Sequence, residues 1–246
     1  VDGSGYEPTG EFRSAENEPI SNLPKALSST LKAGVLANDS RLLLEENRYS
    51  IEGDPTEGAL IVAGAKAGLD ERDIAAQFPR IDTIPFESEY QYMATLNLDF
   101  SNKRKNAFVK GSLEAILARS NQSVDSEGDL VPIDRTVVEN LAAQISQKGL
   151  RVLAIAEKRL PDSQQVLDHE DIAEGLTFLG FQGMLDPPRS EAIQAVRVSQ
   201  EAGIRVKMIT GDHPLTARAI AEQVGIAQAG NVMTGVELSQ IKDEEL

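Results

Sequence analysis

The spacing of apolar residues predicts an α+β module over most of the chain. Helical spacing indicates a helix over residues 23–37, and an almost wholly apolar helix follows Gly53 through Leu69. Between residues 80 and 109 the pattern changes to three strands, 81–86, 92–100 and 105–109, whose polar turns are typical of an antiparallel meander. Further predicted elements are an edge strand with turns in 1–12, a hairpin over 41–51 with Glu46-Asn47 as its turn, a short helix over 111–118, an acidic loop over 123–129, a helix over 133–148, and strands over 151–156 and 176–183.

After Pro187 the pattern alternates between helix and strand. Helices over 190–202 and 214–224 enclose an apolar segment, 205–209, that we expect to be a short buried strand, with another strand near 232–233. Such alternation predicts parallel βαβ winding. The sequence therefore predicts two regions: an antiparallel sheet flanked by helices over 1–185, and a partial Rossmann-like α/β segment over 186–246 that is too short to close a core alone.

Composition excludes several kinds of site. The 246 residues contain no cysteine and two histidines, which excludes disulfides, thiolate zinc sites, cysteine nucleophiles and histidine-rich metal clusters. The net charge of −15 argues against a nucleic-acid surface, and any anionic ligand must be held by local donors. No apolar run is long enough to cross a bilayer, and a chain that begins at Val1 fits a piece excised from a longer protein.

Several segments have both a candidate role in ligand binding and an ordinary structural explanation. Asp54-Pro-Thr-Glu57 reads as a capping box at a helix start. Phe86, in Ile84-Pro-Phe-Glu-Ser88, offers a flat π-face to a base, or fills a core position on its strand. Lys110-Gly111 ends a strand where the backbone can approach a nucleotide, although a solvated lysine is the commoner outcome. Arg151 heads an apolar strand and suits phosphate, or a rim ion pair.

Two segments near the carboxyl end also have both a candidate functional role and an ordinary structural explanation. Thr210-Gly-Asp212 lies between the predicted strand and the helix at Pro214, where free N–H groups and the helix dipole favour an anion. Its ordinary alternative is Asp212 as a plain N-cap. Asp186-Pro-Pro-Arg189 carries two prolines that stiffen a connection, and Pro188 suits a helix start. His169 and His213 are expected to be surface or cap residues.

These segments, in this order along nearly the whole chain, resemble the P-type cation-transporting ATPases, in particular the calcium-pump-like type II branch and its bacterial members. The resemblance adds Gly53-Asp-Pro-Thr-Glu-Gly-Ala-Leu60, Phe86 followed by Met93, and Gly149-Leu-Arg-Val-Leu153 to the matching motifs. It implies a nucleotide-binding domain over 1–185 and the first part of a haloacid-dehalogenase-like phosphorylation domain over 186–246. The implied nucleotide-binding residues are Glu57, Phe86, Met93, Lys110, Gly111, Arg151, Leu153 and Arg189, the hinge is Asp186, Pro187 and Pro188, and the phosphoryl-handling loop is Thr210, Gly211 and Asp212.

The chain departs from the family pattern at identifiable places. The interval between Phe86 and Met93 lacks the basic residue that many members carry and holds Glu89, Tyr90 and Gln91 instead, and Ser112-Leu113 replaces the usual Ala-Pro. The family's phosphorylated aspartate, in Asp-Lys-Thr-Gly-Thr, is absent from this sequence, so no catalytic nucleophile is expected here.

The expected function is therefore that of an ATP-binding cytosolic portion of a bacterial plasma-membrane pump. ATP and, in the whole enzyme, Mg²⁺ are the implied cofactors, and the membrane helices, actuator and remaining phosphorylation domain are the implied partners. One alternative is a soluble nucleotide-sensing module. Another is a self-contained dehalogenase-type phosphatase, which needs its own Asp-x-Asp at a strand end, whereas Asp70–Asp73 falls in a helical pattern.

Overall fold

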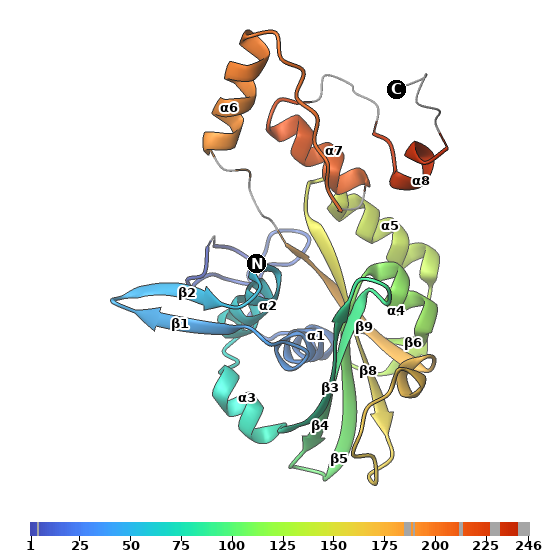
Figure 1. The fold of residues 1–246 in the computed structure, drawn as a ribbon. Helices are drawn as coiled ribbons and strands as arrows, with labels where there is room; N and C mark the ends of the chain where they lie inside the picture. The colour runs from blue at the N-terminus through green and yellow to red at the C-terminus, as the bar shows by residue number, and fades with distance from the viewer. Residues whose placement is uncertain (4, 185–187, 189, 212–213, 227–231, 241–246) are drawn as a thin grey trace. The chain divides into compact units, whose positions relative to one another are not determined.

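The computed structural model describes residues 1–3, 5–184, 188, 190–211, 214–226 and 232–240 (Figure 1). The helices are α1 (Lys25–Leu36), α2 (Pro55–Lys66), α3 (Glu71–Gln77), α4 (Leu113–Arg119), α5 (Arg135–Ser146), α6 (Ser190–Glu201), α7 (Pro214–Gln223) and α8 (Gly235–Leu238), with a 3₁₀ turn η1 (His169–Ile172). The strands are β1 (Arg41–Glu45), β2 (Arg48–Glu52), β3 (Arg80–Glu87), β4 (Tyr92–Asp99), β5 (Arg104–Gly111), β6 (Ser120–Val124), β7 (Leu130–Pro132), β8 (Arg151–Leu160) and β9 (Leu176–Met184).

The described residues form two compact units. The first contains residues 1–135 and 153–182, and the second contains residues 136–152 and 183–246. The division into functional domains at residue 185 remains a prediction. No helix in the described part of the chain is both long and apolar enough to cross a bilayer.

A seven-stranded mixed sheet organises the first unit. Its order is β3-β4-β5-β8-β9-β6-β7. The antiparallel pairing of β3, β4 and β5 confirms the predicted meander, and β8 pairs antiparallel with β5. The sheet predicted as antiparallel is mixed, because β6 pairs with β9 in parallel. The predicted acidic loop is also wrong in part: residues 120–124 and 130–132 form a hairpin, and Asp125 closes its turn by accepting from the backbone N–H groups of Glu127 and Asp129.

The smaller β1–β2 hairpin follows the sequence closely. Its turn residues Glu46 and Asn47 both have positive φ, 45° and 65°, as the twist of a two-residue hairpin requires. The two strands extend away from the large sheet in Figure 1. The edge strand expected in residues 1–12 does not form. In the described part of that segment the backbone makes turns and irregular structure instead.

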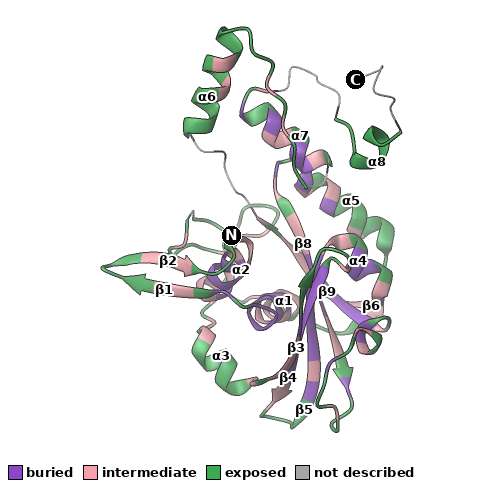
Figure 2. Ribbon diagram, viewed as in Figure 1, coloured by how far each residue is buried: buried purple, intermediate pink, exposed green. Residues whose placement is uncertain are grey.

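Three helices cover one face of the sheet with apolar side chains. Buried residues of α1, α2 and α3 meet Phe108 of β5, Ile155 of β8 and Leu179 of β9. These buried positions are purple in Figure 2. The end of α1 is fixed to the sheet by polar contacts, since the Leu36 carbonyl accepts from the Thr95 hydroxyl and the Arg80 guanidinium. The last carbonyl of α1, which has no partner within the helix, is thus satisfied by residues of β3 and β4.

The second unit differs from the sequence-based expectation. Helices α6 and α7 lie where predicted, but residues 205–209 and 232–233 are not strands, and Ile209 is 98% exposed rather than buried. A strand is stable only when its backbone groups pair with a neighbour, and the described residues of this unit offer none to the 205–209 segment. The predicted parallel βαβ winding is therefore not observed in the described residues.

A carboxylate on the covered face of the sheet generates a stability prediction. Burial raises the pKa of Glu157, and the positive charge of Lys32 only partly opposes the shift. Between its ordinary value of 4.5 and the raised pKa, the folded state binds more protons than the unfolded chain. Stability is therefore lost as the pH rises through that window.

We expect Glu157→Gln to raise the free energy of unfolding at pH 7 by about 1 kcal/mol, or the melting temperature by about 2–4 °C. This gain in the free energy of unfolding should disappear below pH 4.5, the ordinary pKa of a glutamate. The matched control is Glu52→Gln, an exposed glutamate at the end of β2. Calorimetry at several pH values measures both, and a Glu157→Gln protein no more stable than wild type at neutral pH contradicts the argument.

Candidate functional site

Glu57 stands in the first turn of α2, but its carboxylate does not close a capping box. Asp54 caps the helix as predicted, accepting from the backbone N–H groups of Thr56 and Glu57 at 2.8 and 3.2 Å. The reciprocal bond expected from Glu57 back to the cap is absent. Glu57 Oε2 accepts from the Asp39 N–H at 2.9 Å and from the Ser40 hydroxyl at 3.3 Å. The other carboxylate oxygen is left to face the sheet.

That oxygen, Glu57 Oε1, accepts a hydrogen bond from Lys110 Nζ at 2.6 Å. The Lys110 side chain is only 6% exposed and that of Glu57 16%, so the solvated-lysine alternative is wrong. Burial lowers the pKa of Lys110, and the adjacent Glu57 carboxylate, with Asp39 and Asp54 further away, opposes that shift. The ammonium is thus held charged by an acidic neighbourhood within a partly desolvated site.

Gly111 follows Lys110 and permits a very close approach of two backbones. A Cβ at this position would lie 2.5 Å from the Gln91 carbonyl oxygen and 2.8 Å from Tyr92 Cβ. The Gln91 carbonyl also accepts from the Ser112 N–H at 2.9 Å, and Ser112 caps α4 through the Ala115 N–H. Glycine is required here by contact rather than by a left-handed φ.

Strand register places three predicted binding residues in one row. Met93 on β4 pairs with Lys110 on β5, and Lys110 pairs with Ile155 on β8. On β3 the register slips between Ile84 and Glu87, so Pro85 and Phe86 together oppose Met93 in a β-bulge. The row therefore runs from Phe86 at the sheet edge through Met93 to Lys110.

Phe86 is 58% exposed, whereas Met93 is 1% exposed. The core alternative for Phe86 is therefore wrong, since its ring lies at the surface beside a buried row. A large exposed aromatic ring at the edge of this row is a suitable place for a planar ligand to stack. Leu153, two residues before Ile155 on β8, is half-buried.

The remaining predicted residues belong to the second unit or lie outside the described residues. Arg151 begins β8 and is exposed. Thr210 and Gly211 are exposed in the irregular segment before α7, and Pro188 is half-buried. Asp186, Pro187, Arg189, Asp212 and His213 lie outside the described residues. The first unit thus contains Glu57, Phe86, Met93, Lys110, Gly111 and Leu153, whereas Arg151, Pro188, Thr210 and Gly211 belong to the second unit.

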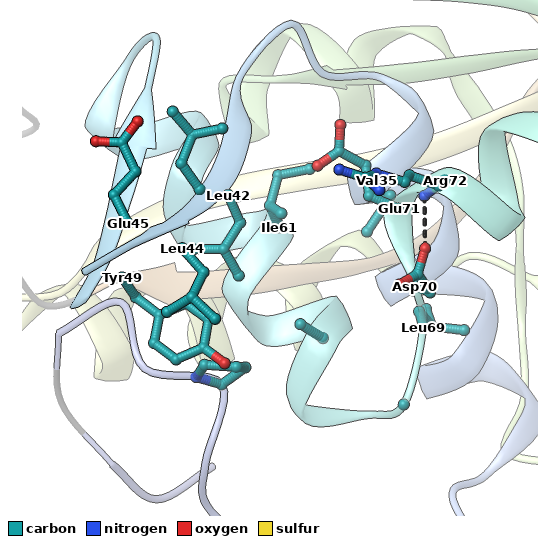
Figure 3. A pocket seen from close by; sticks show the side chains of 14 residues that line it. Val35, Leu42, Leu44, Glu45, Tyr49, Ile61, Leu69, Asp70, Glu71 and Arg72 are labelled. Atoms are coloured by element: carbon teal, nitrogen blue, oxygen red, sulfur yellow. Dashed lines mark hydrogen bonds between the residues drawn. The ribbon is translucent and has the colours of Figure 1, made fainter. Parts of the chain in front are cut away.

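A hollow of about 650 Å³ lies elsewhere in the first unit (Figure 3). It is lined by the β1–β2 hairpin, including Leu42, Leu44 and Tyr49, and by parts of α2 and α3. None of the predicted nucleotide-binding residues lines it. Carboxylates of Glu45, Asp70 and Glu71 border it, and like charges disfavour a triphosphate there. We therefore do not place the nucleotide in this hollow.

Sequence reasoning missed two sets of contacts, one made by Glu57 and one made by the turn that joins β3 to β4. Asp39 and Ser40 hold Glu57 from a loop that carried no motif. His169, expected at the surface or as a cap, instead stacks on Tyr90 with ring centroids 4.1 Å apart and contacts the Tyr92 hydroxyl at 2.5 Å. A separation of 77 residues between Tyr92 and His169 leaves no local signal for that contact.

Comparison with known proteins adds independent findings. The family model of the P-type ATPase cytoplasmic domain N matches residues 26–191. Cation-transporting ATPase pma1 of Synechocystis sp. is 46% identical over 253 residues, which cover 100% of this chain and 28% of that protein. The probable cation-transporting ATPase F of Mycobacterium tuberculosis is 39% identical over 249 residues (99% and 27%), and the calcium-transporting ATPase of Bacillus subtilis is 33% identical over 249 residues (100% and 28%). The chain spans little more than a quarter of the length of these relatives.

The buried pair of Glu57 and Lys110 generates a thermodynamic prediction. We expect Glu57→Gln to cost about 2 kcal/mol of unfolding free energy, because it leaves the ammonium without its countercharge. Lys110→Met should cost less, since Glu57 keeps the Asp39 N–H and the Ser40 hydroxyl. The double variant should be more stable than the sum of the single effects predicts, as a denaturant-based double-mutant cycle would measure.

The pH dependence of the same variants follows from the lowered Lys110 pKa. Between that pKa and the ordinary 10.5, the unfolded chain binds more protons than the folded state, so this lysine makes stability rise with pH in that window. Lys110→Met should remove this contribution, whereas Lys103→Met, at an exposed position, should not. Additive single effects, together with an unchanged alkaline slope, would refute the coupling.

Proposed function

The chain belongs to the P-type ATPase family, and we propose that it is the ATP-binding portion of a cation-transporting pump. The observation that carries the proposal is the row in which exposed Phe86 lies across buried Met93 from the ion-paired Lys110. An aromatic face at the edge of such a row can stack on adenine without reading its charge. Family membership favours this function over a free-standing phosphatase or a sensing module.

In this proposal the first unit seats the base and ribose. Phe86 stacks on adenine, and Glu57 accepts from its amino group, since each carboxylate oxygen has two acceptor sites and Lys110 occupies one on Oε1. Lys110 holds one oxygen of that carboxylate and so fixes its orientation. Gly111 and Leu153 let the backbone and an apolar side chain approach the nucleotide.

The second unit would receive the phosphates. Arg151 and Arg189 offer guanidinium groups that suit phosphate oxygens, and Thr210, Gly211 and Asp212 would hold the transferring phosphoryl group. An aspartate outside this sequence would attack the γ-phosphate, giving an aspartyl-phosphate whose hydrolysis drives cation movement. Asp186, Pro187 and Pro188 would serve as the hinge at which the nucleotide-binding domain meets a haloacid-dehalogenase-like phosphorylation domain.

Magnesium enters only as the ion that accompanies ATP in the whole enzyme. At the row itself the nearby carboxylate, Glu57, is already held by Lys110 Nζ, the Asp39 N–H and the Ser40 hydroxyl. A single engaged carboxylate does not fit the oxygen-rich shell that Mg²⁺ requires, so we assign the ion no ligand there. The proposed partners are the other domains of the pump: the helices in a bacterial plasma membrane, the actuator and the rest of the phosphorylation domain.

We expect Phe86→Ala to weaken ATP binding about tenfold or more, because stacking of a base on an aromatic ring is lost. Phe100→Ala is the matched control: Phe100 is also a large exposed aromatic of this sheet region, 50% exposed, but it lies outside the row. Calorimetric titration with ATP measures both. Equal weakening by the two substitutions, or none by Phe86→Ala, contradicts the placement of adenine.

We also expect the 246-residue chain to bind ATP weakly and not to hydrolyse it, since the phosphorylated aspartate is absent from the sequence. Phosphate release from ATP should match a buffer blank, while the titration above still shows binding. Measurable turnover that Asp212→Ala abolishes would show that the chain carries its own catalytic machinery.

A further inference from the structure

Three aromatic rings gather on the face of the sheet opposite Lys110. Tyr92 pairs with Gly111, one position along from the Met93–Lys110 pair, so Tyr92 and Met93 point to opposite faces. The buried Tyr92 hydroxyl contacts His169 Nδ1 at 2.5 Å, and the His169 ring stacks on Tyr90 with an interplanar angle of 29°. The Arg119 guanidinium lies 4.7 Å from the centre of the Tyr92 ring.

These rings hold the turn that joins Phe86 to Met93. The turn is closed by the Glu87 carbonyl, which accepts from the N–H groups of Tyr90 and Gln91 at 3.1 and 2.8 Å. Gln91 has φ of 59°, in the left-handed region that a residue with a Cβ rarely adopts. Such a backbone persists only when its surroundings fix it.

Two anchors from distant parts of the chain fix it. On one side Ser112 donates its N–H to the Gln91 carbonyl at 2.9 Å and its hydroxyl lies 3.2 Å from the Gln91 side-chain oxygen. On the other side, the ring of His169 contacts the rings of both tyrosines that flank Gln91. His169 belongs to η1, in the connection between β8 and β9. The imidazole does two things that no single aliphatic residue can do: it stacks on one ring and contacts the hydroxyl of the other.

The direction of Phe86 depends on this turn. Phe86 is in a bulge on the edge strand, so the regular ladder does not set its orientation, and its ring is largely exposed. Its backbone is therefore constrained on one side by Ile84, which pairs with β4, and on the other by the turn that begins at Glu87. We propose that His169 is a positioning residue of the nucleotide site, which holds the Glu87–Gln91 turn and through it the adenine-stacking face of Phe86.

This inference rests on the proposed ATP site, but one of its measurements does not. In the nucleotide-free protein, His169→Ala should shift the backbone amide resonances of Phe86 and Gln91, because the turn loses one of its two anchors. It should also raise the Kd for ATP about threefold to tenfold. His169 itself touches no nucleotide in this proposal.

Two conservative variants separate the two contacts and protect the test against simple unfolding. His169→Phe keeps a ring to stack on Tyr90 but cannot hydrogen-bond with the Tyr92 hydroxyl, and Tyr92→Phe removes that hydroxyl while keeping its ring. Each should give a smaller rise in Kd and a smaller shift at Gln91 than His169→Ala. Gln164→Ala is the matched control, since Gln164 stabilises the same β8–β9 connection through the Val166 carbonyl and Asp171 without touching the rings.

Gln164→Ala should lower the melting temperature but leave both the Kd for ATP and the amide resonance of Gln91 as in wild type. The positioning role is overturned if His169→Ala and His169→Phe bind ATP as tightly as wild type, or if Gln164→Ala weakens binding equally. A wild-type chain that fails to bind ATP would instead refute the proposed function. Unmoved Phe86 and Gln91 amides in His169→Ala would overturn the positioning role on their own.

Discussion

The ion pair between Glu57 and Lys110 determines how the first unit is put together at the candidate site. A lysine ammonium that is 6% exposed is stable as a charge only beside a countercharge, and α2 supplies it from its first turn. This requires the start of α2 to lie over the end of β5. Asp54 makes the arrangement possible, because it caps the helix alone and frees the Glu57 carboxylate for Lys110, Asp39 and Ser40.

The sheet places Lys110 in a row with Met93 and Phe86, whose side chains differ in exposure. Met93 beside Lys110 is buried, whereas Phe86 is exposed because it lies in a bulge of β3, the edge strand of the sheet as the described residues form it. In the proposed site, the base would stack on the exposed ring of Phe86. Its affinity would then come from stacking and a few directed hydrogen bonds, so the proposed role depends on a rigid Glu87–Gln91 turn.

Elements with local signals were predicted well, and elements that depend on remote partners were not. The Glu46-Asn47 hairpin and the start of α2 at Asp54 depend on a few neighbouring residues, and the meander joins strands that follow one another in the sequence through short turns. The parallel pairing of β6 with β9 joins segments more than fifty residues apart, and the residue pattern of neither strand predicts it. The expected strand at 205–209 failed for the same reason, since an apolar run is not sufficient without a strand to pair with.

The kinds of residue at the candidate site and their order follow from the amino-acid sequence: an acid at a helix start, an aromatic and a methionine on adjoining strands, and a Lys-Gly pair at a strand end. Tertiary structure alone decided that Glu57 turns from its own helix to Lys110, 53 residues away, that Phe86 is exposed, and that His169 holds two tyrosines. Capping and turn formation depend on a few neighbouring residues, whereas ion pairing and ring stacking depend on which distant surfaces the fold brings into contact.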